Sequence, residues 1–377
     1  MPNNVQLRLM IGPAVPVPVS QPVIDALQSV RITTSSQNGK PSVFQLSFSL
    51  SNRSPLTTLF MVSSAVSIPL VRVVIVVIVN GTTDVLMDGV MTNHQFAPGE
   101  SGQPGTLTIT GEDLSRVMDY LPLDGTPYPA MPPEARVLIM LAKYVLFGVV
   151  PLVIPSVLID VPIPTDRIPR QQGSDLNYLR MLANEVGYTF YVKPGPAPGI
   201  SFAYWGPLLK VGVPQPALNI DMDAHTNVES LTFSYDNESY KLPLLIIQQQ
   251  QSKIPIIIPV PDVTPLNPPL GLVPPIPTGI KPITNAAKLS PVRAAVIGLA
   301  KAAQGAQVVK GTGKLDVVRY GRPLKARELV GVRGAGPAFD GLYFVESVTD
   351  EIKRGEYKQS FTLARNGLIS TLPRVPV

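Results

Sequence analysis

The sequence contains no cysteine, which excludes disulfide bonds and thiolate metal sites and fits a chain that folds in a reducing cytoplasm. It has only two histidines, His94 and His225, which are far apart and lack the spacing of a metal site. Charged residues make up 15% of the chain and apolar residues 45%, so much of the surface must be neutral or buried against another protein. This balance favours an assembly component over a lone soluble monomer.

A secretory signal and a clear membrane span are also lacking. The first residues show no basic segment followed by an apolar core. Residues 71–79 are strongly apolar but too few for a spanning helix and include Arg72, so they predict a buried strand. Residues 137–161 are numerous enough, but Lys143 and two prolines interrupt them, which predicts a partly helical, packed segment. We expect synthesis in the bacterial cytoplasm and no stable membrane insertion.

Charge and proline content narrow the possible partners. The 31 basic and 26 acidic residues give a net charge of +5 without a basic run, which does not indicate a nucleic-acid surface. The 42 prolines cluster, and residues 254–283 carry one every two or three positions. Such spacing excludes a helix or the interior of a sheet, and the isoleucines and leucines disfavour a solvated tether. We therefore predict an extended strap that lies on protein.

The first third of the chain has the alternating pattern of β-strands. Apolar and polar residues alternate at 5–9 and 44–50, and Asn80-Gly81 after the 71–79 run is a strong turn signal. Further strands are predicted at 85–91 and 107–110. Five or more strands joined by Gly, Asn and Pro turns predict a first β-barrel or sandwich over residues 1–112.

Residues 113–227 change to helical periodicity and predict an α/β insert. A short helix is expected from Glu112 and another from Pro132. The clearest helix begins after Ser174, a capping residue, and ends at Gly187, where a left-handed cap is expected; a strand follows at 188–192. Its apolar stripe consists of Leu176, Leu179, Leu182, Ala183 and Val186.

Residues 228–377 predict a second β unit. Strands are expected at 231–235, 315–319 and 329–332, together with a helix from Ser290 through Ala303. A hairpin is predicted from residues 341–352 and 356–363, with Lys353-Arg-Gly-Glu as the turn. Simple alternation places Tyr343, Val345, Ser347 and Thr349 on one face of its first strand, and Tyr357, Gln359, Phe361 and Leu363 on one face of its second. The predicted fold class is α+β, mainly β, with two barrels flanking an α/β insert.

Polar clusters do not assemble a catalytic site. Asp221-x-Asp223-x-His225 is the densest one, and it is interpreted as a turn because no further metal-ligand motif follows it, the alternative being a divalent-metal or acid/base site. Residues 331–336 are glycine-rich but lack the Lys-Ser/Thr end of a phosphate loop, so a β-turn is expected there. The lone Trp205 is interpreted as a core or interface anchor, with a ligand platform as the alternative.

The remaining carboxylates also fail to suggest chemistry. Asp350 and Glu351 stand beside Lys353 and Arg354 and predict a solvated charge cluster in a turn. No Gly-x-Ser-x-Gly nucleophile elbow occurs in the chain. We therefore predict no catalytic residue, no cofactor and no metal, and expect that the protein is not an enzyme.

Four stretches carry a family resemblance. Residues 341–368, GLYFVESVTDEIKRGEYKQSFTLARNGL, resemble the closing barrel segment of the late control protein D family, the central baseplate hubs of contractile phage tails and related injection machines. The stretches VPIPTDRIPRQQGSDLNYLRMLANEVGYTFYV, VGVPQPALNIDMDAHTNVESLTF and TPLNPPLGLVPPIP look like hub proteins of extracellular contractile injection systems, and they stand in the correct order.

The resemblance implies a structural role. In such hubs each subunit contributes two similar barrels, and three subunits build a ring of six that matches a sixfold inner tube to a threefold spike. Implied partners are two further copies, the inner tube protein, neighbouring baseplate or wedge proteins and a separate spike protein, since the sequence stops at Pro376-Val377 without a needle. Structural or interface candidates are Ser174, Leu176, Leu179, Leu182, Gly187, Trp205, Tyr343, Val345, Tyr357 and Phe361.

Two alternatives come from other classes. A cell-wall-acting hydrolase of a tail particle would need paired carboxylates or a nucleophile with its base in a cleft. A membrane-associated adhesin or pore would need residues 137–161 to enter lipid.

Overall fold

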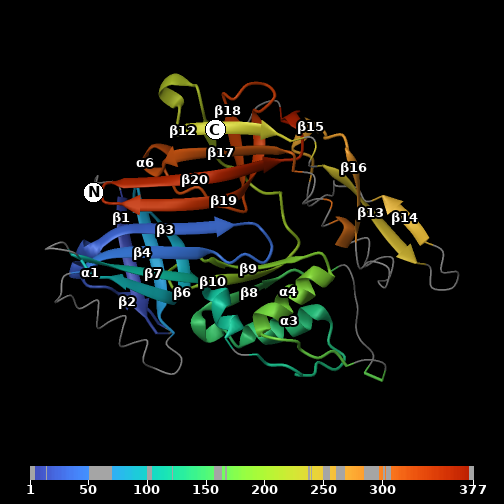
Figure 1. Ribbon diagram of the computed structural model, residues 1–377, viewed down its shortest axis with the longest axis horizontal. Coiled ribbons are helices and arrows are strands. Elements are labelled where there is room, and N and C mark those ends of the chain that lie inside the picture. Colours follow the sequence, from blue (N-terminus) through green and yellow to red (C-terminus); the bar gives the residue numbers. More distant parts are fainter. Residues whose placement is uncertain are drawn as a thin grey trace.

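The computed structural model describes residues 5–372, apart from 14, 51–69, 100–103, 121, 157–163, 166–167, 237, 239, 249–254, 260–267, 284–296, 300–301 and 303–306. Two curled β-sheets stand edge to edge, and an α/β insert packs beside the first of them (Figure 1). The α+β, mainly β class is therefore confirmed. Among the described strands, however, no ladder closes either β unit into the predicted barrel.

The first sheet runs in the order β3-β4-β7-β6-β5-β1. All its pairs are antiparallel, and a short strand, β2, adds to β1. The bounds are β1 Val5–Gly12, β2 Val17–Pro18, α1 Gln21–Ala26, β3 Leu27–Ser35, β4 Val43–Leu50, β5 Arg72–Val79, β6 Thr82–Ala97 and β7 Gly105–Asp113. The predicted strands and the Asn80-Gly81 turn are confirmed, with both turn residues at positive φ.

The second sheet repeats this order strand by strand. It runs β12-β17-β20-β19-β18-β11, so that β11 takes the place of β1, β12 of β3, β17 of β4, β18 of β5, β19 of β6 and β20 of β7. One pair departs from the match, since β11 lies parallel to β18. The bounds are β11 Gln215–Asn219, η4 Asp223–His225, β12 Val228–Tyr235, β17 Val309–Asp316, α6 Val317–Tyr320, β18 Leu329–Arg333, β19 Gly341–Lys353 and β20 Glu356–Arg365.

The two sheets also share the positions of two irregularities. The register shifts at the second residue of β3 against β4, and it shifts at the second residue of β12 against β17. A second shift follows Met91 in β6 against β7, and the matching shift follows Val345 in β19 against β20. Bulges are specific features that redirect a strand. Agreement in strand order and in these two bulges makes the two sheets copies of one structural unit, although the shift after Ile75 in β5 against β6 has no counterpart in β18 against β19.

Strand β3 joins the two copies. It pairs antiparallel with the second half of β19, from Ser29 opposite Lys353 to Ser35 opposite Ser347. The ladder makes one continuous sheet, and one hydrophobic cluster extends through both units, from Leu9 and Phe48 to Tyr343 and Leu363.

The insert has its own core beneath a three-stranded sheet ordered β8-β10-β9. Its helices lie on the outer side of that sheet (Figure 1). Its elements are η2 Leu114–Asp119, α3 Pro133–Ala142, η3 Val145–Phe147, β8 Val149–Val153, α4 Asp175–Glu185, β9 Thr189–Pro194 and β10 Ser201–Gly206. The prediction that 137–161 is partly helical and then extended is confirmed for its described part. None of the described helices is long and apolar enough to cross a membrane.

Helix α4 forms for the reasons visible in its sequence. The Ser174 hydroxyl accepts a hydrogen bond from the Asn177 amide at 3.2 Å, and Gly187 ends the helix at φ +69°. The stripe of Leu176, Leu179 and Leu182 is buried. Asp175 is buried as well, and its carboxylate accepts hydrogen bonds from Gln171, Lys143 and Tyr144 at 2.6 to 2.8 Å.

The proline-rich segment forms strands as well as extended chain. Strand β14 (Pro255–Pro259) and strand β16 (Gly279–Ile283) flank β13 (Lys241–Gln248), while β15 (Gly271–Val273) pairs with β21 (Leu368–Ser370). The described residues of this segment are extended, and their pairing with β13 was not predicted. That the strap lies on another protein stays a prediction. The prolines of this segment that lie in the sheet, Pro255, Pro259 and Pro282, are on its edge strands, where proline is tolerated.

Three local predictions need correction. Residues 315–319 are not a strand, because β17 ends at Asp316 and that carboxylate caps the short helix α6. Strand β3 was not predicted. In β19 the bulge at Glu346 reverses the alternation, so Tyr343 and Val345 share the core with Val348 and Ile352 rather than with Ser347 and Thr349. The predicted helix from Ser290 lies mostly outside the described residues.

An ion pair ties the first sheet to the insert. Arg72 of β5 makes two hydrogen bonds to Asp88 of β6, at 2.8 and 2.7 Å, and a third to the Gly199 carbonyl at 3.0 Å. Ser201 of β10 donates to the same Asp88 carboxylate at 2.9 Å, and both charged side chains are buried.

Replacing Arg72 with Met is expected to lower the free energy of unfolding by about 3 to 5 kcal/mol, because Asp88 is left as a buried charge without its cation. Chemical denaturation monitored by tryptophan fluorescence measures this loss. The double variant Arg72→Met with Asp88→Asn is the control and is expected to recover part of it. A single variant that loses less than about 1 kcal/mol would contradict the assignment.

Candidate functional site at the seam between the two sheets

The seam is the antiparallel ladder between β3 and β19. Side chains meet across it at two exposed or half-buried places: the Thr33 and Thr349 hydroxyls lie 3.2 Å apart, and Arg31 Nη2 lies 3.1 Å from Glu351 Oε1. The Arg–Glu pair is exposed and contributes little to stability. The backbone ladder and the shared core therefore supply most of the joining energy.

One residue of the seam carries a buried carboxylate that points into the core. Asp350 of β19 accepts hydrogen bonds from the Tyr357 hydroxyl and the Gln359 amide, both at 2.7 Å. Gln359 also bonds the backbone of Leu324 through both its amide nitrogen and its oxygen. The predicted solvated cluster at Asp350 is thus wrong, because the bulge at Glu346 turns this residue into the interior.

Burial raises the pKa of Asp350 to about 6, and the hydrogen bonds from Tyr357 and Gln359 lower it only in part. The pKa of Tyr357 is raised well above its ordinary value, first by burial and then by the neighbouring Asp350 charge. The two groups stabilise each other's position, and neither is paired with a nucleophile or base that would make a catalytic set.

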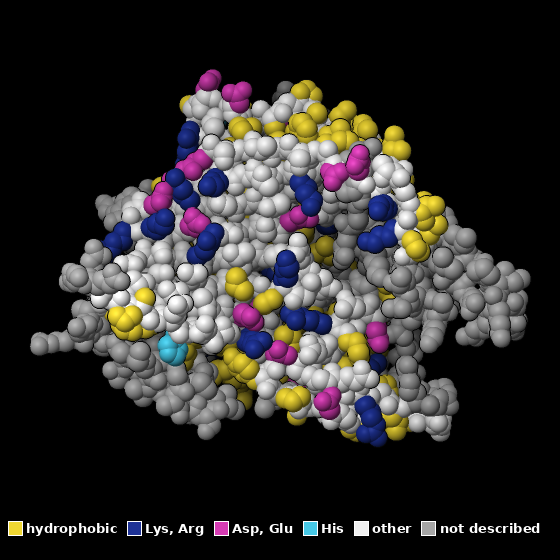
Figure 2. Space-filling view, in the orientation of Figure 1, with side chains coloured by type: hydrophobic (Ala, Val, Ile, Leu, Met, Phe, Trp, Pro, Cys, Tyr) yellow, Lys and Arg dark blue, Asp and Glu magenta, His cyan; other side chains and the backbone are white. Residues whose placement is uncertain are grey.

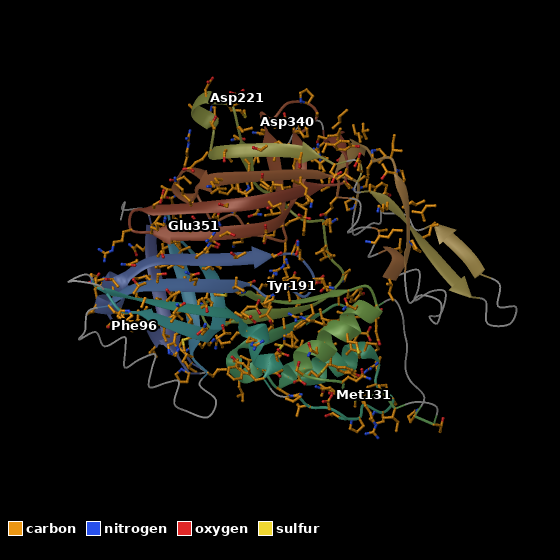
Figure 3. All side chains as sticks on the ribbon, viewed as in Figure 1. Phe96, Met131, Tyr191, Asp221, Asp340 and Glu351 are labelled. Carbon is orange, nitrogen blue, oxygen red and sulfur yellow. The ribbon has the colours of Figure 1, made fainter. Side chains whose placement is uncertain are left out.

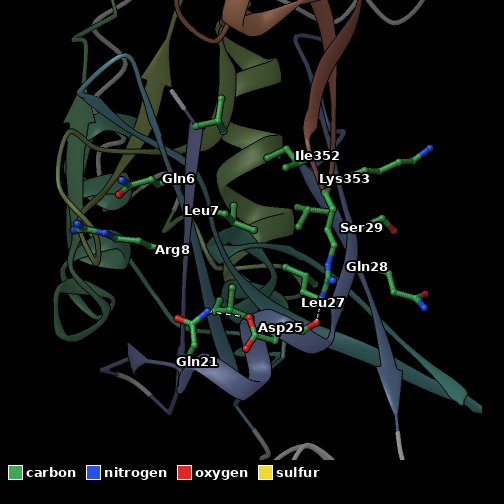
Figure 4. A pocket seen from close by; sticks show the side chains of 14 residues that line it. Gln6, Leu7, Arg8, Gln21, Asp25, Leu27, Gln28, Ser29, Ile352 and Lys353 are labelled. Carbon is green, nitrogen blue, oxygen red and sulfur yellow. Dashed lines mark hydrogen bonds between the residues drawn. The ribbon is translucent and has the colours of Figure 1, made fainter. Parts of the chain in front are cut away.

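A pocket of about 760 Å³ opens at one end of the seam (Figure 4). Its walls are β1, α1, the start of β3 and the β19–β20 turn. Gln21 of α1 donates to Asp25 at 2.9 Å, and Arg354 of the turn donates to the Asp25 carbonyl. Among the described residues β1 and β3 share no ladder, so the pocket marks the place where the first sheet stays open.

A smaller pocket, about 290 Å³, lies where both sheets and the insert meet. The Arg327 guanidinium stacks 4.2 Å from the Tyr191 ring of β9 and donates to the Ser35 carbonyl at 2.5 Å. Lys325 lies 2.8 Å from Asp84 of β6. Burial lowers the pKa of Arg327 and raises that of Tyr191. Cation–π and ionic contacts hold the three parts together here.

The predicted structural or interface residues are placed inside the chain. Ser174, Leu176, Leu179, Leu182 and Trp205 are buried in the insert, with Gly187 half-buried at its helix end. Tyr343, Val345, Tyr357 and Phe361 are buried in the second sheet. Trp205 is fully buried and packs edge-on against Tyr188 at 5.0 Å, so it offers no exposed platform to a ligand. These side chains stabilise the units, and surface contacts must use other residues.

The other polar motifs are turns. Asp221, Asp223 and His225 are exposed around η4, and no group of metal-ligating side chains occurs in the described part of the chain. The glycine-rich 331–336 segment ends β18 in a turn, with Gly334 and Gly336 at positive φ.

Three places with exposed apolar side chains bear on contacts with other proteins: two groups and one single residue. One group lies on the insert, at Leu138, Ile139, Val145, Leu146, Val150 and Leu152; a second lies near β15 and β21, at Leu272, Val273, Ile276, Ile369 and Leu372. Figure 2 shows hydrophobic side chains along the end of the molecule where β12 and β15 lie. Charges of both signs are spread over the face below that end in this view. The third place is a strand edge: Phe96 of β6 is 43% exposed (Figure 3). Sequence periodicity could not reveal these sites. It indicates which face of a strand or helix is apolar, but not which faces and strand edges the folded chain leaves uncovered.

Solved structures similar to this chain include tail proteins and a secretion component. A tail protein from Neisseria meningitidis MC58 matches 97% of this chain and 98% of its own length at 13% identity, with a TM-score of 0.62. The 43 kDa tail protein of prophage MuSo2 from Shewanella oneidensis matches 96% and 98% at 13% identity, with a TM-score of 0.60.

A third similar structure belongs to the E. coli c3393 protein, described as a component of the type VI secretion system with structural similarity to the T4 bacteriophage tail proteins gp27 and gp5. It matches 98% of this chain and 81% of its own length at 12% identity, with a TM-score of 0.53. No family model matches the chain, and no curated protein matches its sequence. The chain therefore has the fold of these tail proteins, in line with the resemblance found in its sequence.

The pKa of Asp350 predicts a pH dependence of stability. Because the folded chain holds this proton more tightly than the unfolded chain, the free energy of unfolding falls as pH rises from about 4 to about 7. Asp350→Asn removes this dependence and keeps an oxygen for both donors. The stability difference between the variant and the native chain is expected to change by roughly 2 kcal/mol between pH 4 and pH 8, in favour of the variant.

Denaturation at several pH values measures this change. Glu351→Gln, one residue along the same strand but exposed, is the matched control and is expected to show a much smaller change. Equal pH profiles for Asp350→Asn and the native chain would contradict the buried-carboxylate assignment.

Proposed function

We propose that this protein is a structural baseplate hub of a contractile injection machine. Three copies form a ring of six matching β units, two from each chain. The ring adapts a sixfold inner tube on one side to a threefold spike on the other, and the insert faces neighbouring baseplate proteins. The protein is made in the bacterial cytoplasm and resides in the baseplate of the assembled particle.

The duplicated sheet is the observation that carries this proposal. Two units of the same strand order and bulge positions stand side by side in one chain. A chain that contains two equivalent units can meet a sixfold partner with three copies, and differences between the units still leave threefold features for a second partner.

The likeness to tail proteins supports the same conclusion. It extends over nearly the whole of this chain and of the two tail proteins, which supports a role in a tail assembly for the chain as a whole. Among the described residues, the buried titratable groups are engaged in structural networks, as Asp350 and Asp175 are. A hydrolase or a membrane pore has no comparable observation in its favour.

Image reconstruction of the particle that contains this protein tests the proposal. The expected result is three copies at the tube end that meets the spike, with six similar β units around the central channel. A peripheral position, or six copies in a strictly sixfold ring, would overturn the proposal. Incubation of the purified protein with cell-wall material is expected to release no fragments.

A further inference from the structure

We infer that the outer edge of β12 in one copy pairs antiparallel with residues 93–97 of β6 in the next copy, which repeats between chains the β3–β19 seam found within each chain. The inference rests on the proposed ring and specifies its contact. The occupant of each edge is therefore a second copy of this chain.

The β3–β19 seam is the template for this contact. Strand β19 is longer than β18, which accompanies it only from Gly341 to Phe344. Beyond the bulge at Glu346, the same edge of β19 receives β3, from Ser347 to Lys353. The seam thus forms along the part of β19 that extends beyond the end of β18.

Strand β6 likewise extends beyond the end of its neighbour β5 and leaves one edge without a partner strand among the described residues. Strand β5 accompanies it up to Val90, and the Met91 amide still donates to the Val71 carbonyl. After the bulge at Thr92, residues 93–97 pair with β7 on one side. On the other side, no strand in the described part of the chain adjoins them. This edge corresponds to the edge of β19 that binds β3.

Strand β12 is the counterpart of β3. It pairs with β17 as β3 pairs with β4, including the bulge at the second residue. Within the described ranges, β12 is the last strand of the long sheet and has no ladder on its other side. Its counterpart β3 uses that side to form the seam. An exposed strand edge of this kind is a template for pairing with another chain.

The bulges fix the register of the proposed contact. Residues 33 and 349 face each other in the seam, and their counterparts by strand position are Ser234 in β12 and Gln95 in β6. The proposed ladder therefore sets Gln95 opposite Ser234 and Phe96 opposite Phe233. A shift by one residue would move every side chain to the other face.

The side chains on the two edges suit this register. Phe96 is a large apolar residue exposed to solvent, and Phe233 is half-buried against Phe339, with ring centroids 5.1 Å apart. Their pairing removes Phe96 from water and extends the aromatic cluster of the second unit by one ring. Cross-strand aromatic pairs of this kind stabilise antiparallel sheets.

The positions of the two edges allow the contact to propagate. Strand β12 lies at one end of the long sheet, and β6 lies beyond the seam in the other unit (Figure 1). A contact between unlike edges is heterologous, and it closes into a ring when the rotation per copy allows it. The within-chain and between-chain seams then alternate around the ring.

Cysteine crosslinking tests the pairing, and the absence of native cysteine gives a clean background. The test variant of the full chain carries Gln95→Cys with Ser234→Cys, both at exposed positions. Mild oxidation is expected to give linked dimers and a covalently closed trimer on a non-reducing gel. Directly opposed residues in an antiparallel ladder have the spacing that a disulfide requires.

Two matched controls accompany the Gln95→Cys, Ser234→Cys variant. Thr33→Cys with Thr349→Cys stands at the corresponding place in the seam and is expected to link within one chain, without a gain in mass. Gln95→Cys with Thr232→Cys shifts the pair by two residues on the same face, and its crosslinking is expected to be at least tenfold lower.

The mass of each unoxidised variant in solution, from light scattering, separates two ways of failing. A trimer in which Gln95→Cys and Ser234→Cys do not link, or link no better than the shifted pair, overturns the inferred ladder and leaves the proposed hub intact. A chain that remains a monomer, while the Thr33 and Thr349 control links internally, overturns both. A trimer with the in-register link supports both.

A second variant tests the contact without cysteine. Phe96→Asp places a charge on the β6 edge, and it is expected to raise the concentration needed for trimer formation at least tenfold. Val213→Asp, at another exposed apolar position away from both edges, is expected to leave that concentration unchanged. Equal effects of the two substitutions would overturn the role of this edge.

Discussion

The ladder between β3 and β19 is the contact on which the rest of the structure depends. It turns two separate six-stranded units into one sheet with a common hydrophobic cluster. It also fixes how the second unit stands relative to the first. Stacking of Arg327 on Tyr191 then holds the insert at their junction, and the Lys325–Asp84 pair adds a further link between the two units. The ability to present two similar units at a set spacing follows from this ladder.

The two units differ in side chains where their surroundings differ. Asp350 and Phe96 occupy corresponding positions after the second bulge, but Asp350 is buried with Tyr357 and Gln359, while Phe96 is exposed. The neighbouring strands have diverged with them: Tyr357 donates to Asp350, whereas its counterpart Gly105 has no side chain and lies against the Phe96 ring. The seam inside the chain is polar on its inner side at Asp350, whereas the corresponding edge of the first unit carries the apolar Phe96.

Much of the fold could be predicted from the sequence, because most of it follows from local patterns. Helix α4 was located by Ser174 and Gly187, and β5 and the closing hairpin by their alternation. Strand β3 was missed because Leu27–Ser35 has few apolar residues and depends on partners on both sides. The burial of Asp350 was missed because a single bulged residue, Glu346, reverses the faces of β19, and periodicity carries no signal for it. The equivalence of the β6 and β19 edges, and of β12 and β3, follows from the strand order of the two sheets and has no counterpart in the sequence pattern.

The central claim is that one chain holds two equivalent units and that three chains close a ring of six. Electron microscopy of the purified full chain tests it most directly. The account predicts threefold particles in which six similar β lobes surround a central opening, with the insert on the outside at three of the positions. Single-chain particles, or closed rings with a number of chains other than three, would contradict it.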